Sequence, residues 1–139
     1  MTITFDVYQQ IHYTIGHHPA ERGGMIGGKD GIINRYLYDP CKDASNRCYY
    51  PNVNVLNTIL NVWAKEDILL YGIIHSHPNN MAELSSKDIE FARAILHENP
   101  KMKDVLFPIV FTEVDSTAFQ IIPYIVDRTG VRYSQLKII

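Results

Sequence analysis

The sequence predicts a three-layer α/β (α+β) domain, in which helices flank one mixed, mostly antiparallel sheet. Two observations favour this class. Segments with helical periodicity alternate with strand-like segments, and some strand-like segments follow one another as hairpins. In addition, the length of 139 residues suits a single domain, residues 1–139, that buries its own hydrophobic core.

The first part of the chain predicts a helix and a hairpin. After a short extended start, Asp6 can cap a helix whose apolar residues recur at helical spacing: Tyr8, Ile11 and Ile15. Residues 23–39 contain two apolar runs around a Gly-Lys-Asp-Gly turn, which is typical of a two-stranded hairpin.

The next segment changes from polar to amphipathic. Residues 39–47 predict a loop, and residues 48–50 predict a short strand before Pro51. Residues 54–65 predict a helix, because its apolar residues share one face: Val55, Leu56, Ile59, Leu60, Val62 and Trp63.

The second half begins with a dense apolar run, residues 68–74, which predicts a strand buried on both faces and leads directly into His-Ser-His-Pro. A helix is expected from Ser85 or Ser86 to about His97, with four residues facing inward: Ile89, Ala92, Ile95 and Leu96. Further strands are expected at 105–112, at 117–126 and, after a turn, at 131–139.

Composition excludes several classes of function. The 13 lysines and arginines against 15 aspartates and glutamates give a net charge of −2, so we expect neither nucleic acid nor a membrane as a partner. No apolar run is long enough to span a bilayer. The first residues contain no export signal, which predicts a cytoplasmic protein in which Cys41 and Cys48 are free thiols.

Two histidines at the end of the central apolar run indicate a metal site. His75 and His77 lie two residues apart, so strand geometry places both imidazoles on one face, at a spacing suited to chelating one ion. Asp88 falls in the first turn of the following helix when Ser85 is the N-cap, and its carboxylate can reach toward the strand end. Two imidazoles and one carboxylate are the donor set of a catalytic zinc site that keeps its fourth position for water.

An upstream glutamate can supply the acid–base group that such a site needs. A base must take a proton from the activated water, and an acid must return one to the leaving amine. Glu21 stands at the entrance to the predicted hairpin, where neighbouring glycines leave its carboxylate room to point into a cleft. The sequence leaves open whether Glu21 meets the histidines in space. Taken singly, Glu21 would be an ordinary loop residue, Ser85 an N-cap and Asp88 a helix-terminal carboxylate.

The pattern as a whole is more specific than its parts. The segment from residue 75 to 88 fits H-x-H-x7-S-x2-D, and Glu21 begins an upstream E-x-x-G-x-x-x-G. Together they resemble the JAMM signature of the JAB/MPN metalloprotease family, the zinc-dependent deubiquitinases and their prokaryotic relatives. The resemblance extends to the order of elements over most of the chain, and it implies a cytidine-deaminase-like JAB/MPN architecture. It also implies that His75, His77 and Asp88 ligate Zn²⁺, that Glu21 is the general acid/base, and that Ser85 holds the water or stabilises the oxyanion.

The resemblance further implies a reaction and a substrate. Family members cleave an amide or isopeptide bond after the Gly-Gly-type tail of a ubiquitin-like protein, and a tail paired with a sheet edge would need no large pocket. This chain has Leu84 where many relatives have proline and Gly23 where many have another small residue, and neither position supplies a ligand. The short length predicts a prokaryote-style ubiquitin-like substrate and no selection among polyubiquitin linkages.

Other interpretations stay open. The zinc chemistry does not identify the acyl donor, so a non-ubiquitin amide or peptide conjugate is an alternative substrate. A non-catalytic scaffold is a second alternative, against which the complete motif argues. A deaminase would need His-x-Glu and Pro-Cys-x-x-Cys patterns, which the sequence lacks. The sequence does not predict the oligomeric state.

The remaining histidines and aromatic residues fit no pattern of this kind. By strand alternation, Ser76 is expected to point away from the metal. The other histidines are expected at the surface or at helix ends: His12, His17, His18 and His97. Three aromatic residues are better explained as core than as a substrate groove: Tyr49, Tyr50 and Trp63.

Overall fold

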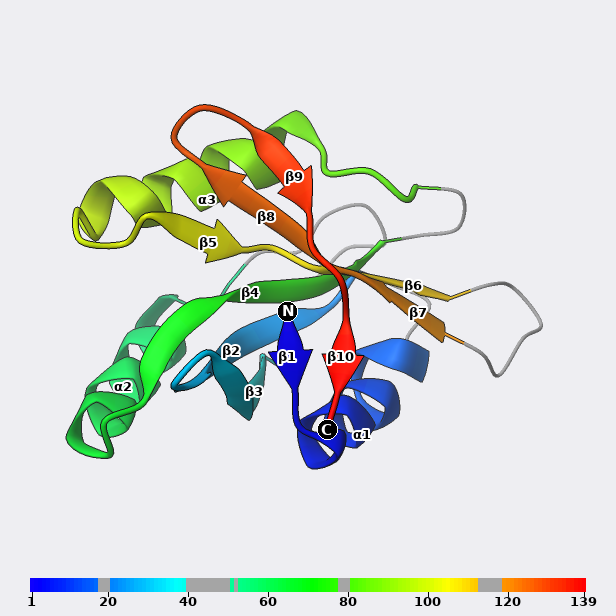
Figure 1. Cartoon of the computed structure of the whole chain (residues 1–139), viewed down its shortest axis with the longest axis horizontal. Coiled ribbons are helices and arrows are strands. Elements are labelled where there is room, and N and C mark those ends of the chain that lie inside the picture. Colours follow the sequence, from blue (N-terminus) through cyan, green and yellow to red (C-terminus); the bar gives the residue numbers. More distant parts are fainter. Residues whose placement is uncertain (18–20, 40–50, 52, 78–80, 113–118) are drawn as a thin grey trace.

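The computed structural model describes residues 1–17, 21–39, 51, 53–77, 81–112 and 119–139. In these ranges, ten strands form one curled mixed sheet, which three α-helices flank (Figure 1). The main strand order is β10-β1-β3-β2-β4-β5-β8-β9, and β6 pairs with β4 and β7 beside this path. The fold class predicted from the sequence is therefore confirmed.

The N-terminal elements are β1 (Thr2–Ile3), α1 (Phe5–Tyr13) and the short 3-10 helix η1 (Ile15–His17). The N-cap of α1 is Thr4, so the prediction that Asp6 caps this helix is wrong. Thr4 has extended backbone, and its hydroxyl accepts a hydrogen bond from the backbone N–H of Val7. Asp6 instead lies in the first turn, where a carboxylate is favoured by the helix dipole.

The predicted hairpin is formed by β2 (Gly23–Lys29) and β3 (Ile32–Asp39), which pair in antiparallel fashion. Its two-residue turn has positive φ at both positions, 53° at Asp30 and 79° at Gly31. That geometry matches the twist of a hairpin, and glycine adopts it without strain.

The helix α2 (Val53–Lys65) confirms the prediction of a helix in this segment. Only part of the apolar face that the sequence predicts is buried. Leu56 and Trp63 are buried against the core, whereas Val55 and Val62 are 41% and 45% exposed. The buried stripe is thus narrower than the apolar stripe of the sequence. The predicted strand at residues 48–50 lies outside the described residues.

The central strand β4 (Leu69–His77) is buried from Gly72 to its end, but Leu69 is 64% exposed. The prediction of a strand buried on both faces therefore holds only for its second half. α3 (Ser86–Glu98) follows as predicted, with Ala92 and Leu96 buried.

Each of the three strands predicted after α3 is divided into two. They form β5 (Asp104–Leu106), β6 (Ile109–Thr112), β7 (Phe119–Ile122), β8 (Tyr124–Asp127), β9 (Val131–Tyr133) and β10 (Lys137–Ile138). Pro108 separates β5 from β6, and Pro123 separates β7 from β8. Proline has no N–H for the ladder, and the halves take different partners: β5 pairs with β8, and β6 pairs with β7.

The core is divided between the two faces of the sheet, which makes the domain three-layered. On one face, α2 and α3 pack over a cluster that includes Met25 and Ile73. On the other face, α1 packs over a cluster that includes Ile26 and Ile74. Because side chains alternate along β4, His75 and His77 share the face of Ile73, which α3 covers.

Candidate metal centre

The two histidines lie on the central strand of the sheet. β4 pairs with β2 on one side, with Gly23 opposite His75, and with β6 on the other, with Phe111 opposite His77. His75 is 1% exposed and His77 6%. Ser76, between them, accepts a hydrogen bond at its Oγ from the backbone N–H of Arg22 at 3.0 Å. The expectation that Ser76 points away from the metal ligands is confirmed.

Asp88 reaches the histidines from the first turn of α3. Ser85 is the N-cap, and its Oγ accepts a hydrogen bond from the Asp88 N–H at 3.1 Å. In return, the Ser85 N–H donates to Asp88 Oδ2 at 2.8 Å, which completes a capping box. The reciprocal bonds fix the carboxylate beside the end of β4. Ser85 therefore orients Asp88 whatever other role its hydroxyl has.

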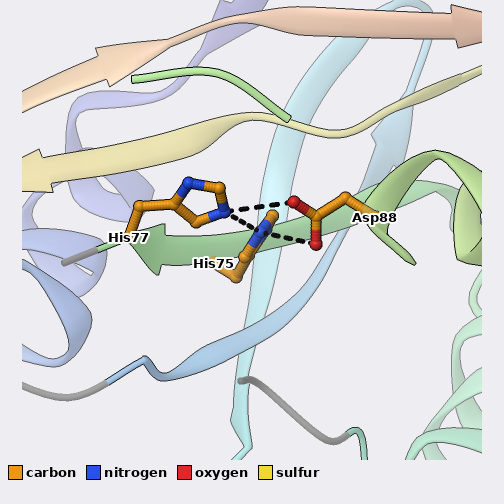
Figure 2. Close-up of side chains that lie close together, drawn as sticks. All are labelled: His75, His77 and Asp88. Atoms are coloured by element: carbon orange, nitrogen blue, oxygen red, sulfur yellow. Dashed lines mark hydrogen bonds and ion pairs between the residues drawn. The ribbon is translucent and has the colours of Figure 1, made fainter. Parts of the chain in front are cut away.

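The three side chains converge on one point (Figure 2). Asp88 Oδ1 lies 3.2 Å from His75 Nε2, and Asp88 Oδ2 lies 3.1 Å from His77 Nε2. The two Nε2 atoms are 2.8 Å apart. Donors at zinc-binding distance from one tetrahedral ion would be about 3.3 Å from each other, so the observed spacing fits such an ion after small adjustments.

A backbone carbonyl selects the tautomer of His77. His77 Nδ1 lies 2.9 Å from the carbonyl oxygen of Met81. Because a carbonyl only accepts, Nδ1 carries a proton, so it is Nε2 that faces His75 and Asp88 and that offers a lone pair to a metal once its own proton is lost. The sequence does not reveal this contact, since any residue at position 81 offers the same carbonyl.

The charge states of Asp88 and His75 also suit a metal site. Burial opposes ionisation of Asp88, but hydrogen bonds to His75 and His77 outweigh it and hold the pKa of the carboxyl far below its usual value. Burial lowers the pKa of His75 despite the neighbouring carboxylate. Burial also acts against the charged form of His77, but the hydrogen bond and charge of Asp88 raise its pKa overall. Around neutral pH, an ionised carboxylate thus faces a neutral His75.

Glu21 is close to the same site. It is 7% exposed and lies just before β2. Gly23 pairs with His75, and the backbone carbonyl of Arg22 accepts a hydrogen bond from the Ser76 N–H, so Glu21 directly precedes the residue bonded between the two histidines. The negative charge of Glu21 also contributes, after the larger effects of Asp88 and Met81, to the raised pKa of His77. The structure therefore brings together His75, His77 and Asp88, which could hold a metal ion, with Ser85 bonded to Asp88 and with the buried Glu21 just before β2.

Comparison with known proteins agrees with this arrangement. The model of a protein family described as prokaryotic homologs of the JAB domain matches residues 6–122. The chain belongs to the prokaryotic JAB domain family. No curated protein gives a significant match.

Solved structures similar to this JAB-domain chain share its fold at low sequence identity. A protein from Desulfitobacterium hafniense has a TM-score of 0.77 at 18% identity, covering 99% of this chain and 92% of its own. A JAB1/MPN domain protein from Archaeoglobus fulgidus has a TM-score of 0.56 at 16% identity, covering 100% and 99%. A structure described as "JAMM: a metalloprotease-like zinc site in the proteasome and signalosome" has a TM-score of 0.54 at 18% identity, covering 100% and 97%.

Three other described residues considered in the sequence lie apart from this JAB-domain site: Trp63, His12 and His97. Trp63 is buried in the core, as expected. His12 lies in the last turn of α1 and stacks on Phe119, with ring centroids 4.6 Å apart, and His97 is exposed. Among the described helices, none is long and apolar enough to cross a membrane. The remaining positions fall outside the described residues or have no described side chain: His17, His18, Cys41, Cys48, Tyr49 and Tyr50.

Proposed function

We propose that this JAB-domain protein is a zinc-dependent hydrolase of the JAMM type, an isopeptidase or peptidase that cleaves an amide bond. The observation that carries the proposal is the convergence of His75, His77 and Asp88 beside a buried Glu21. The ligand atoms of the first three residues all lie within 4.8 Å of one another. An N2O donor set of this kind is typical of catalytic zinc sites and leaves a position for water.

Each residue then has a distinct role. Zinc, when bound by His75, His77 and Asp88, supplies a Lewis acid that polarises a carbonyl and lowers the pKa of water. Glu21 takes the proton from the attacking water and returns it to the leaving amine, since it is a buried carboxylate next to Arg22, which bonds to Ser76 between the two histidines. The Ser85 Oγ accepts from the Asp88 N–H, which leaves the hydroxyl proton able to donate to the developing oxyanion.

We further propose that the substrate is a ubiquitin-like protein, cleaved after its C-terminal tail during deconjugation or precursor processing. Membership of the JAB domain family supports this substrate class. So does the structure described as a metalloprotease-like zinc site in the proteasome and signalosome, which shares the fold. Main-chain pairing of an extended tail with a sheet edge would supply affinity. A cytoplasmic location, and the absence of nucleic acid and membrane partners, stay predictions from the sequence.

A hydrolase of another amide or peptide conjugate is the alternative function, because the donor set selects the reaction and not the acyl group. A non-catalytic scaffold is less favoured. A scaffold would have no need of a buried glutamate beside a complete set of metal ligands.

The test is cleavage of a panel of ubiquitin-like fusions and amide conjugates, with and without a chelator. We expect cleavage of at least one ubiquitin-like fusion that the chelator abolishes and zinc restores. Glu21→Gln should lower the cleavage rate by about 10²- to 10⁴-fold, because the carboxylate that moves the proton is lost. Zinc content should stay at the wild-type level.

The matched control is Glu90→Gln, which removes an exposed carboxylate from α3 and should leave the rate unchanged. Equal cleavage by Glu21→Gln and the wild type would contradict the acid–base role. Cleavage only of the amide conjugates would favour the alternative substrate class, and a zinc-loaded protein that cleaves nothing in the panel would favour the scaffold.

A further inference from the structure

A short segment, residues 81–85, is the part of the connection between β4 and α3 that leads into α3. Its first carbonyl, that of Met81, accepts the hydrogen bond from His77 Nδ1 at 2.9 Å. Its last residue, Ser85, forms the capping box with Asp88. The position of this segment therefore affects one ligand from β4 and another from α3.

A buried tyrosine from a third element holds the same segment. The hydroxyl of Tyr124, the first residue of β8, donates to the carbonyl of Ala82 at 2.8 Å. Ala82 directly follows Met81, so two successive carbonyls accept hydrogen bonds from two different strands. The peptide between them is fixed from both sides, which restricts where the Met81 carbonyl can lie.

Tyr124 is itself well anchored beside the site. It is 5% exposed, and its carbonyl accepts a hydrogen bond from the Phe107 N–H at 2.9 Å. The ring of Phe107 packs edge-on against His75, with centroids 5.3 Å apart. The backbone bond between Phe107 and Tyr124 thus links the ring that packs against His75 to the hydroxyl that holds the segment contacting His77.

A second tyrosine supports the first. The hydroxyl of Tyr133 on β9 lies 3.1 Å from that of Tyr124, and their rings are 4.7 Å apart. Because the Ala82 carbonyl only accepts, the proton of Tyr124 points to Ala82 and Tyr133 must donate to Tyr124. Such a chain of donors strengthens each bond in it.

We propose that Tyr124 is a positioning residue of the metal centre, which acts through the Ala82 carbonyl to hold Met81 against His77. Tyr124 acts at one remove: it bonds to the Ala82 carbonyl, which is one peptide along the chain from the Met81 carbonyl that contacts His77. The inference rests on the proposed function of His75, His77 and Asp88 as a metal site.

The test is Tyr124→Phe, which removes the hydroxyl and keeps the ring. We expect zinc affinity, measured by competition with a chromophoric chelator, to fall about three- to tenfold, the equivalent of one lost hydrogen bond. The visible absorption bands of the Co²⁺-loaded protein should change in shape or intensity, because they report how the ligands are oriented. Tyr133→Phe, which leaves the bond to Ala82 in place, should cause a smaller loss.

The matched control is Tyr36→Phe. Tyr36 also has a mostly buried hydroxyl, 2.8 Å from Thr14 Oγ1, but it packs with the α1 cluster on the opposite face of the sheet. We expect zinc affinity and the Co²⁺ spectrum of Tyr36→Phe to match the wild type.

The outcomes separate the inference from the proposed function. Wild-type zinc affinity and an unchanged Co²⁺ spectrum in Tyr124→Phe would overturn the inference alone. Equal losses in Tyr124→Phe and Tyr36→Phe would also overturn it, because general destabilisation would explain both. A wild-type protein that binds neither Zn²⁺ nor Co²⁺ would overturn the proposed function and this inference together.

Discussion

The two faces of β4 have different tasks although they belong to one strand. Toward α3, the strand presents His75 and His77, which are buried and face Asp88. Toward α1, it presents Ile74, which is fully buried in an apolar cluster. Burial of apolar surface stabilises the fold, whereas burial of polar groups costs free energy unless they are paired. The alternation of side chains along β4 thus separates the face that stabilises the fold from the face that carries the candidate metal ligands.

Substitution of one residue on each face should separate these tasks most clearly. His77→Ala removes a ligand and should weaken zinc binding more than about 100-fold, beyond the effect of losing a group that only orients a ligand. Ile74→Ala leaves a cavity and should lower the free energy of unfolding by about 2–5 kcal/mol, measured by urea denaturation of the metal-free protein. Zinc stoichiometry of folded Ile74→Ala should remain that of the wild type.

Ser76→Ala provides the control within the strand. By strand alternation Ser76 is on the Ile74 face, and its hydroxyl accepts a hydrogen bond from the Arg22 backbone N–H, so zinc affinity should change little. Tight zinc binding by His77→Ala, or a loss in Ser76→Ala as large as that in His77→Ala, would contradict the division between the faces.

The two side-chain N-caps offer a finer comparison. Thr4→Ala at α1 and Ser85→Ala at α3 each remove a hydroxyl that accepts from a backbone N–H. Each should lower the free energy of unfolding by about 1 kcal/mol. Only Ser85→Ala should also weaken zinc binding, by about tenfold, because its hydroxyl holds the turn that carries Asp88. Equal zinc affinities of the two variants would show that the cap does not orient the ligand.

The smallest predicted effect concerns high pH on the α1 face. Burial raises the pKa of Tyr36 above its ordinary value of 10, and the hydrogen bond to Thr14 only partly offsets this. Below pH 10 the phenol is neutral in both states. Above pH 10 the Tyr36 phenol ionises in the unfolded chain before it ionises in the folded protein. The stabilisation that the buried, neutral phenol contributes is therefore lost as pH rises. Tyr36→Phe should be less stable than the wild type by about 1 kcal/mol at pH 9.

At pH 11, the difference between Tyr36→Phe and the wild type should nearly vanish, since one pH unit above the unfolded pKa corresponds to about 1.4 kcal/mol. Urea denaturation of both proteins at the two pH values measures it. A difference that stays constant would show that Tyr36 ionises equally in the folded and unfolded states.

The sequence predicts the site better than it predicts the sheet. His75 and His77 follow from strand alternation, and Asp88 follows from the N-cap at Ser85, because each depends on local geometry. The division of two strands at Pro108 and Pro123 was missed, since local periodicity does not show that β5 and β6 take different partners. The exposure of Val55 and Val62 was missed because apolar spacing on α2 does not reveal how much of the helix the sheet covers.

Some contacts of the site have no signature in the sequence. The Met81 carbonyl is a backbone group, and its contact with His77 depends on how the chain returns from β4 to α3. Tyr124 is separated from Ala82 by 42 positions, and only the sheet brings its hydroxyl to that carbonyl. Such long-range contacts require the tertiary structure.

The central claim is that His75, His77 and Asp88 hold one zinc ion. Zinc K-edge X-ray absorption of the purified wild-type protein, normalised to protein concentration, tests it most directly. We predict about one zinc per chain, with a nitrogen and oxygen shell at about 2.0–2.1 Å that includes two imidazoles. A protein without zinc, or a sulfur shell at about 2.3 Å, would contradict the account.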